Sequence, residues 1–133
     1  MGILSSKPKL PVGSASTTKQ LGDAAEDQAL RYLLAQGLRL VERNYRTPGR
    51  GGGEIDLIML CPDGTLVFVE VRKRTSQRFG GAAASVGGVK QRRIVLAAHH
   101  YLLRWRTLPP CRFDVVLVEP SGIQWLQAAF DAH

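Results

Sequence analysis

The chain has 133 residues, of which 44% are hydrophobic and 22% are charged, the balance of an ordinary globular domain and not of a disordered chain. This length accommodates one domain and excludes a cofactor domain beside a separate substrate domain. The chain has 18 Lys and Arg against 11 Asp and Glu, a net charge of +7, and such a surplus favours a polyanionic partner, nucleic acid before a membrane.

The sequence indicates a cytoplasmic protein. The two cysteines, Cys61 and Cys111, fit neither a metal site nor a disulfide framework, so reduced thiols are expected. No run of about 18 apolar residues is present to span a bilayer, and the first twenty residues lack the apolar stretch of a secretory signal. Because those residues are rich in Ser, Thr, Pro and Lys, we predict a flexible basic arm over residues 1–20, followed by a single domain over residues 21–133.

The first half of this domain is predicted to hold one helix and three strands. A helical repeat runs over residues 22–37 and ends at a glycine. Strands follow at residues 38–46, 54–61 and 65–74, the last two joined by a Pro-Asp-Gly turn. The first strand is expected to alternate regularly, so that its odd-numbered residues share one face.

The second half is predicted to hold one helix and one or two strands. A stretch of small residues at 75–88 is expected to be a loop or a short helical turn, and a second helix covers residues 89–105. The apolar stripe of that helix comprises Ile94, Ala97, Ala98, Tyr101 and Trp105. Strands are expected at residues 112–119 and 122–127. The order predicts an α/β domain with a mixed central sheet flanked by helices.

The Pro-Asp-Gly connection predicts how the second and third strands pair. A three-residue loop with Gly64 in the left-handed conformation pairs Cys61 with Thr65. Following the ladder from that pair, Asp56 lies opposite Glu70, with the two Cβ atoms about 5 Å apart on one face of the sheet.

Two opposed carboxylates repel each other, so this pairing needs an explanation. A divalent cation between the oxygens is one explanation, since Mg²⁺ and Mn²⁺ prefer oxygen ligands. Alternatively, both carboxylates reach solvent at the sheet edge, where arginines neutralise them. The hairpin by itself leaves both explanations open.

Glu26 is a third acidic candidate for this site. On a helical wheel it lies within about 40° of Leu30 and Leu33, so its carboxylate shares the apolar side of the helix. The alternative is a first-turn Glu that is stabilised by the helix N-terminus.

Arg72 is the cationic candidate, because it shares a strand face with Glu70 whereas Lys73 points to the other face. The same register sets Arg72 opposite Glu54. Arg72 is therefore either the cation beside the acid pair or the cross-strand partner of Glu54.

Residues 71–113 contain neither Asp nor Glu, and they are rich in Lys and Arg. From this stretch we select as candidate nucleic-acid contacts Arg74, Arg78, Lys90, Arg92 and Arg93. The last three fall in the first turns of the second predicted helix, where free backbone N–H groups also attract phosphate. The alternative is a solvated positive face that serves solubility.

Seven segments carry a resemblance to a known family. In chain order they are GDAAEDQALRYLLAQG, RNYR, GEIDLI, LVFVEVRKR, FGGAAASV, KQRRI and RFDVV. Together they resemble the YraN-like proteins, small bacterial proteins related to the Holliday-junction resolvases and to the wider restriction-endonuclease-like nucleases. The resemblance spans roughly residues 21–130 and implies a restriction-endonuclease-like αβββαβ core.

The same resemblance implies roles for the candidate residues. Asp56 and Glu70 match the two acids of the nuclease motif, and Glu26 matches the additional helix Glu of resolvase-type members. Arg72 stands where that motif has Lys. The implied activity is Mg²⁺- or Mn²⁺-dependent phosphodiester hydrolysis in branched or structured DNA, with Asp56, Glu70, the Val71 carbonyl and Glu26 around the metal.

Because an Arg side chain stays protonated and cannot act as a base, two function classes remain open. One is a working endonuclease, and the other is a nucleic-acid-binding module with a residual site. A protein-interaction scaffold is a third, less favoured class, because a protein partner does not explain the acid-free basic stretch. Kinship with resolvases also implies that the chain can form a homodimer.

Overall fold

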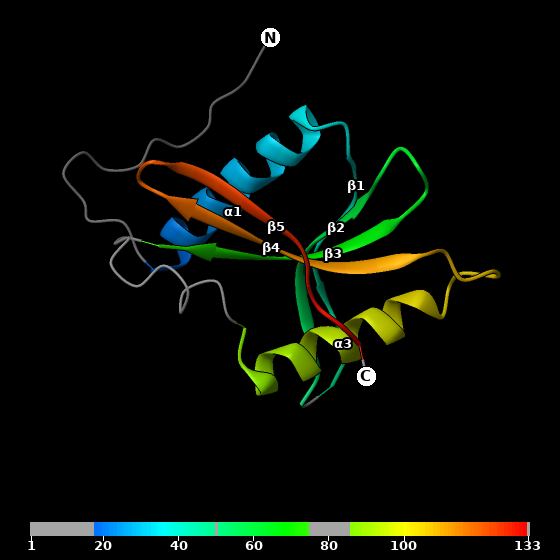
Figure 1. The fold of residues 1–133 in the computed structure, drawn as a ribbon. Coiled ribbons are helices and arrows are strands. Elements are labelled where there is room, and N and C mark those ends of the chain that lie inside the picture. The colour runs from blue at the N-terminus through cyan, green and yellow to red at the C-terminus, as the bar shows by residue number, and fades with distance from the viewer. Residues whose placement is uncertain (1–17, 50, 75–85, 133) are drawn as a thin grey trace, which may run out of the picture.

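The computed structural model describes residues 18–49, 51–74 and 86–132. These residues form a five-stranded sheet with two helices packed against it (Figure 1). The elements are α1 (Thr18–Ala35), β1 (Arg39–Arg46), β2 (Glu54–Leu60), β3 (Leu66–Lys73), α3 (Gly88–Leu102), β4 (Cys111–Glu119) and β5 (Gly122–Phe130). The predicted α/β class and the predicted order of elements are confirmed.

Two segments predicted from the sequence, the N-terminal arm and the loop over residues 75–88, lie partly outside the described residues. Helix α1 begins at Thr18, inside the range predicted for the basic arm, and residues 1–17 lie outside the described residues. Most of the loop predicted over residues 75–88 also lies outside them, together with Arg78. None of the described helices is long and apolar enough to cross a membrane.

The sheet is mixed, with the strand order β1-β2-β3-β4-β5. Neighbouring strands are antiparallel except β3 and β4, which run parallel. A parallel pair requires a crossover connection, and the crossover here includes α3. As a result, the N-terminal end of α3 is joined through the chain to the end of β3 that follows Glu70.

Alternating side chains divide the core between the two helices. Ile58 and Phe68 pack with Ile94 of α3, whereas Leu57 and Val69 pack with Leu33 of α1. In the stripe predicted for the second helix, Ile94, Ala97, Ala98 and Tyr101 are buried and Trp105 is half-buried against the same cluster.

The predicted β2–β3 hairpin is confirmed. Gly64 has a φ of 93°, and the Cys61 backbone N–H donates to the Thr65 carbonyl over 2.8 Å. The ladder then runs from the Leu60–Leu66 pair to the Leu57–Val69 pair, in the register that the turn predicted.

Regular alternation in β1 is a wrong prediction. The strand has an irregularity between Leu40 and Glu42, and Asn44 has a φ of 53°. Consequently Arg43 lies on the α1 side, where it contacts Asp27, while Tyr45 is buried in the α3 cluster. The positive φ of Asn44 interrupts the regular alternation of the strand, so the two odd-numbered residues that flank it lie on opposite faces.

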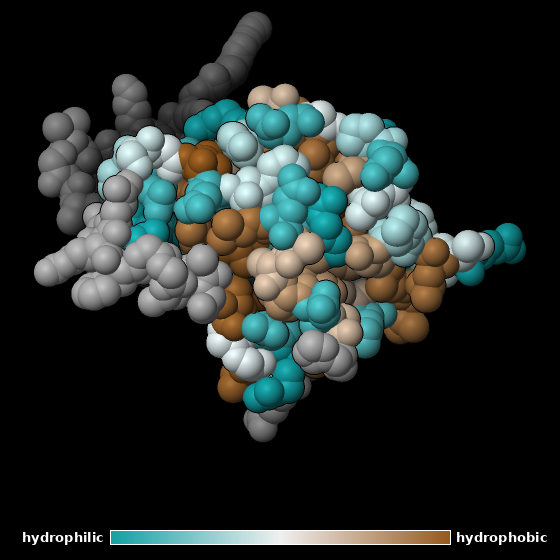
Figure 2. Space-filling model, in the orientation of Figure 1, coloured by the Kyte–Doolittle hydropathy of each residue, from teal (hydrophilic) through white to brown (hydrophobic). Residues whose placement is uncertain are grey.

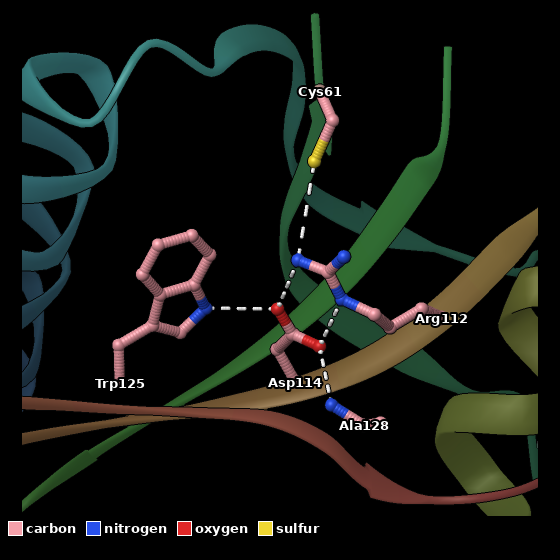
Figure 3. Close-up of polar contacts among 5 residues, drawn as sticks. All are labelled: Cys61, Arg112, Asp114, Trp125 and Ala128. Atoms are coloured by element: carbon pink, nitrogen blue, oxygen red, sulfur yellow. Dashed lines mark hydrogen bonds and ion pairs between the residues drawn. The ribbon is translucent and has the colours of Figure 1, made fainter. Parts of the chain in front are cut away.

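A buried polar network joins β4 to β5. Figure 3 shows the Asp114 carboxylate between the Arg112 guanidinium, the Trp125 indole N–H and the Ala128 backbone N–H. Asp114 is fully buried and lies where the β4–β5 register shifts. Its oxygens accept hydrogen bonds from all three neighbours, so this carboxylate stabilises the packing of β4 against β5.

Helix α3 lies against the start of β2 because Gly53 has no side chain. A Cβ atom at Gly53 would be 1.9 Å from the Arg93 carbonyl oxygen and 3.0 Å from the Ala97 Cβ. The face of the molecule seen in Figure 2 mixes hydrophilic and hydrophobic residues. Leu103 and Leu108, in the connection from α3 to β4, are among the most exposed apolar side chains of the described residues.

Candidate functional site

Asp56 and Glu70 meet where the β2–β3 ladder ends. The last regular pair is Leu57 with Val69, and one step further the two carboxyl groups lie close enough that each shifts the pKa of the other. The Val71 backbone N–H donates to Asp56 Oδ2 over 2.8 Å. The side chain of Asp56 thus accepts a hydrogen bond from the backbone of β3. The two acids are neighbours, although the regular ladder ends before the pair that was predicted between them.

Glu26 joins this pair from α1. The charge of Asp56 is among the causes that raise the pKa of Glu26 to about 7, second to burial. The Glu26 Oε1 atom is buried without a hydrogen-bond partner among the described residues, and its neighbouring cation is Arg43, with Nε 3.7 Å away. Because α1 begins at Thr18, Glu26 lies more than two turns into the helix, and the first-turn explanation for this acid is wrong.

Burial and mutual repulsion make the three acids hard to ionise together. Burial is the largest cause of the raised pKa of Asp56, and the Val71 N–H and the Glu70 carboxyl oppose it. Burial followed by the charge of Asp56 raises the pKa of Glu70 to about 8. Because the Glu70 carboxyl lowers the pKa of Asp56 while Asp56 raises the pKa of Glu70, their interaction favours a proton on Glu70.

Two cations approach the same oxygen of Glu70. Arg72 Nε lies 3.9 Å from Glu70 Oε2, and Lys90 Nζ lies 3.6 Å from it. Glu54 instead has Arg46 as an ion-pair partner, with Arg46 Nη2 3.8 Å from Glu54 Oε2. The structure therefore supports the position of Arg72 beside the acid pair and not its alternative as the partner of Glu54.

Lys90 was predicted as a nucleic-acid contact, and its contact with Glu70 was not anticipated. It lies in the first turn of α3. The number of residues between β3 and α3 does not indicate where this helix packs against the sheet. Only the shared acid-free stretch hinted that Lys90 belongs near Arg72.

The other predicted nucleic-acid contacts have different surroundings. Arg92 and Arg93 are exposed on α3, open to a phosphate backbone. Arg74 is buried, and its Nη1 donates to Glu119 Oε2 over 2.6 Å. This buried ion pair does not favour Arg74 as a phosphate contact, because withdrawing its guanidinium would leave the Glu119 carboxylate without that cation.

An open cavity of about 480 Å³ adjoins the acid cluster. Glu26 forms part of its wall together with Asp23, Asn44 and Glu54. The opening lies between α1, β1 and the start of β2, so solvent and small ions reach the Glu26 side of the cluster.

The carboxyl oxygens of Asp56, Glu70 and Glu26 are ligands of the type that a hard divalent cation prefers. Three carboxyl groups supply oxygens, and one buried oxygen of Glu26 lacks a hydrogen-bond partner within the described residues. Across that same part of the chain, however, no three acidic, His or Cys side chains are already arranged to hold a metal ion. The raised pKa of Glu70 instead favours a proton on that residue.

Comparison with known proteins identifies a family. The model of the uncharacterised protein family UPF0102 matches residues 25–118, which is more than half of the chain. The chain belongs to the UPF0102 family. The matched range contains Glu26, Asp56, Glu70, Arg72 and Lys90, so the whole acid and cation cluster lies within the part that UPF0102 describes.

Individual UPF0102 proteins are similar over most of the chain. A UPF0102 protein from Paracidovorax citrulli is 66% identical over 134 residues, covering 99% of both chains. Another, from Albidiferax ferrireducens, is 69% identical over 116 residues, covering 87% of this chain and 91% of the relative. A third, from Acidovorax sp. strain JS42, is 63% identical and covers 99% of both chains.

Proposed function

We propose that the chain is a metal-dependent endonuclease that hydrolyses phosphodiester bonds in branched or structured DNA. One observation carries the proposal: Asp56 and Glu70 are brought together at the end of a ladder, with two cations on the Glu70 carboxylate. Such a cluster does not stabilise the fold, because repulsion and burial both disfavour the ionised acids and raise their pKa values.

The contrast with Asp114 supports a functional reading of the cluster. Asp114 is fully buried, yet its oxygens accept hydrogen bonds from three neighbouring residues. Glu26, by comparison, keeps a buried oxygen unbonded among the described residues. A buried acceptor without a hydrogen bond costs free energy, and a ligand at this oxygen, which faces Arg43 Nε at 3.7 Å, would supply the missing partner.

Asp56 and Glu70 would hold Mg²⁺ or Mn²⁺, with Glu26 and the Val71 carbonyl as further oxygen donors. The ion would polarise a phosphoryl oxygen and lower the pKa of a water molecule. In the reaction, the water oxygen forms a bond to phosphorus as the bond to the leaving oxygen breaks. One proton of that water passes to the leaving oxygen, which gives a phosphate monoester and a hydroxyl end.

The basic residues supply the binding surface in this proposal. Arg92 and Arg93 are exposed on the same helix as Lys90, and Arg93 lies within about 60° of Lys90 on the helical wheel, so a DNA backbone that contacts Arg93 would pass near Lys90. Phosphate contacts of this kind give affinity without sequence preference.

The choice of DNA as substrate rests on resemblance. The seven segments resemble the YraN-like proteins, and the relation of those proteins to the Holliday-junction resolvases favours branched DNA. The described order α1-β1-β2-β3-α3-β4 is compatible with the αβββαβ core of restriction-endonuclease-like proteins, and we include that core in the proposal.

A nucleic-acid-binding module is the second candidate. Two observations favour it: Arg72 occupies the position where the nuclease motif has Lys, and the described residues lack a preformed group of three metal ligands. In that case the acid cluster is a residual site, and binding through Arg92 and Arg93 persists without cleavage.

Cleavage and gel-shift assays on the purified protein distinguish the endonuclease from the binding module. Linear, flapped and four-way DNA are incubated with Mg²⁺ or Mn²⁺, and a parallel sample contains a chelator. The endonuclease cleaves at least one substrate in a metal-dependent manner, whereas the binding module shifts the DNA in a gel and leaves it intact with either metal.

A further inference from the structure

We infer that Lys90 is a catalytic residue of the proposed nuclease site, whose ammonium donates to the phosphoryl oxygen that becomes more negative during hydrolysis. The inference rests on the proposed function and adds a residue from α3 to a site otherwise built from α1 and the β2–β3 hairpin. It gives Lys90, and not Arg72, the role of the cation that contacts the reacting phosphate.

The geometry at Glu70 carries the inference. Lys90 Nζ and Arg72 Nε lie within 3.6 Å and 3.9 Å of the same atom, Glu70 Oε2. The Glu70 side chain is 7% exposed, whereas that of Lys90 is 41% exposed. The Lys90 side chain, like the Arg72 side chain at 34% exposed, therefore lies between the buried Glu70 carboxylate and solvent, the side from which a phosphate must approach.

The two cations differ in what they can offer that phosphate. Arg72 faces Glu70 with Nε, the inner nitrogen of a rigid planar fork. Lys90 presents a compact ammonium with three donors on a flexible stem. The ammonium can keep its ion pair with Glu70 while one of its N–H groups donates to a phosphoryl oxygen, so Lys90 can bridge the acid cluster and the substrate.

The position of α3 fixes where this ammonium lies. Lys90 is in the first turn of the helix, and Gly53 permits the backbone of that helix to pack directly on the start of β2 at Arg93. Arg92 and Arg93 extend from the next positions. DNA bound along this helix would therefore be held by the same rigid element that carries Lys90.

The test compares Lys90→Ala with Arg72→Ala and Arg92→Ala in the full-length chain. Three quantities are measured for each: kcat and KM on the best four-way or flapped substrate, the Kd for that DNA without metal, and the Mn²⁺ concentration that half-saturates the shift in melting temperature. The last two do not depend on cleavage.

Lys90→Ala is expected to lower kcat by about 10²-fold or more, the scale of removing one transition-state donor. Its Kd for DNA should change less than that of Arg92→Ala. Mn²⁺ should bind Lys90→Ala at a lower concentration than the parent, because the ammonium no longer competes at Glu70 Oε2. Arg72→Ala should keep more of the parent kcat than Lys90→Ala does.

Two results would overturn the inference while leaving the proposed function intact. In the first, the parent cleaves and Lys90→Ala keeps its kcat while losing only affinity, as a plain phosphate contact would. In the second, Arg72→Ala loses kcat and Lys90→Ala does not. A parent that cleaves no substrate with either metal would instead remove the proposed function, and the catalytic role of Lys90 with it. An unchanged Mn²⁺ midpoint in Lys90→Ala would show that the ammonium does not act at Glu70.

Discussion

The Val71 backbone N–H donates a hydrogen bond to the Asp56 side chain over 2.8 Å, one step beyond the last regular pair of the β2–β3 ladder. This bond keeps the Asp56 carboxyl at the end of the β2–β3 ladder, close enough to Glu70 and Glu26 to shift their pKa values. Asp56 is therefore the residue through which the hairpin and α1 are joined in one acid cluster.

Protein stability without metal should fall as the pH rises towards 8. The native state holds a proton on Glu70, whose pKa is raised from 4.5 to about 8, and on Glu26, whose pKa is raised to about 7. The unfolded chain loses both protons near their ordinary values, so the native state binds more protons between about pH 5 and 8. The free energy of unfolding should drop by roughly 1 kcal/mol or more across that range.

Urea unfolding in a chelator at several pH values measures this slope. Glu70→Gln is the control, because it cannot lose a proton and should flatten the decline. A stability that instead rises between about pH 5 and 8, in the parent but not in the variant, would contradict the raised pKa of Glu70.

Two buried aspartates should respond in opposite ways to replacement by Asn. Asp56→Asn keeps an oxygen for the Val71 N–H and removes like-charge repulsion, so its melting temperature without metal should equal or exceed that of the parent. Asp114→Asn removes the charge that faces Arg112 inside the β4–β5 network (Figure 3), and should cost roughly 3 kcal/mol.

Differential scanning calorimetry then measures the melting temperatures of the parent and of Asp56→Asn with and without Mn²⁺. The stabilisation that Mn²⁺ gives the parent by mass action should disappear in Asp56→Asn. Asp63→Asn, an exposed turn residue of the same hairpin, should keep it. A full metal-dependent shift in Asp56→Asn would mean that the ion binds elsewhere.

DNA binding should depend strongly on salt and weakly on sequence. Each phosphate contact contributes about 0.9 to the slope of log K against log salt. The double variant Arg92→Ala/Arg93→Ala should therefore reduce that slope by up to about 2, which anisotropy titrations over a salt series can measure. Arg39→Ala, an exposed arginine on β1, serves as the control. Equal slopes in the parent and the double variant would exclude this surface of α3.

Replacing Gly53 should displace α3. In Gly53→Ala, the new Cβ would meet the Arg93 carbonyl oxygen at 1.9 Å, and the overpacking should cost about 1–3 kcal/mol. Gly87→Ala is the matched control, because nothing lies within 4 Å of a Cβ at that position. Chemical denaturation of both variants measures the difference, and equal stabilities would show that α3 does not pack on Gly53 as described.

The hairpin was predictable because its determinants are local. The Pro-Asp-Gly turn sets the loop length, and Gly64 accepts the positive φ that the turn needs. The pairing of every residue down to Leu57 and Val69 follows from those few residues. The neighbourhood of Asp56 and Glu70 could therefore be reached from the sequence.

Features that depend on tertiary packing could not be predicted from the local sequence. The positive φ of Asn44 reverses the faces of β1, and no Gly marks that position. Arg74 looked like one more member of a basic stretch, but its ion-pair partner, Glu119, comes from β4, 45 residues away in the sequence. The contact of Lys90 with Glu70 depends on where α3 returns to the sheet, which the spacing of residues does not encode.

Cleavage of four-way and flapped DNA by the parent, Asp56→Asn and Glu70→Gln, with Mg²⁺ or Mn²⁺, tests the central claim most directly. The claim predicts metal-dependent cleavage by the parent and its loss, by about 10²-fold or more, in both variants, while their affinity for DNA persists. Cleavage that continues unchanged in both variants would contradict the claim, because the acid cluster would then have no part in the reaction. A parent that binds these substrates and cleaves none of them would contradict it equally, in favour of the binding module.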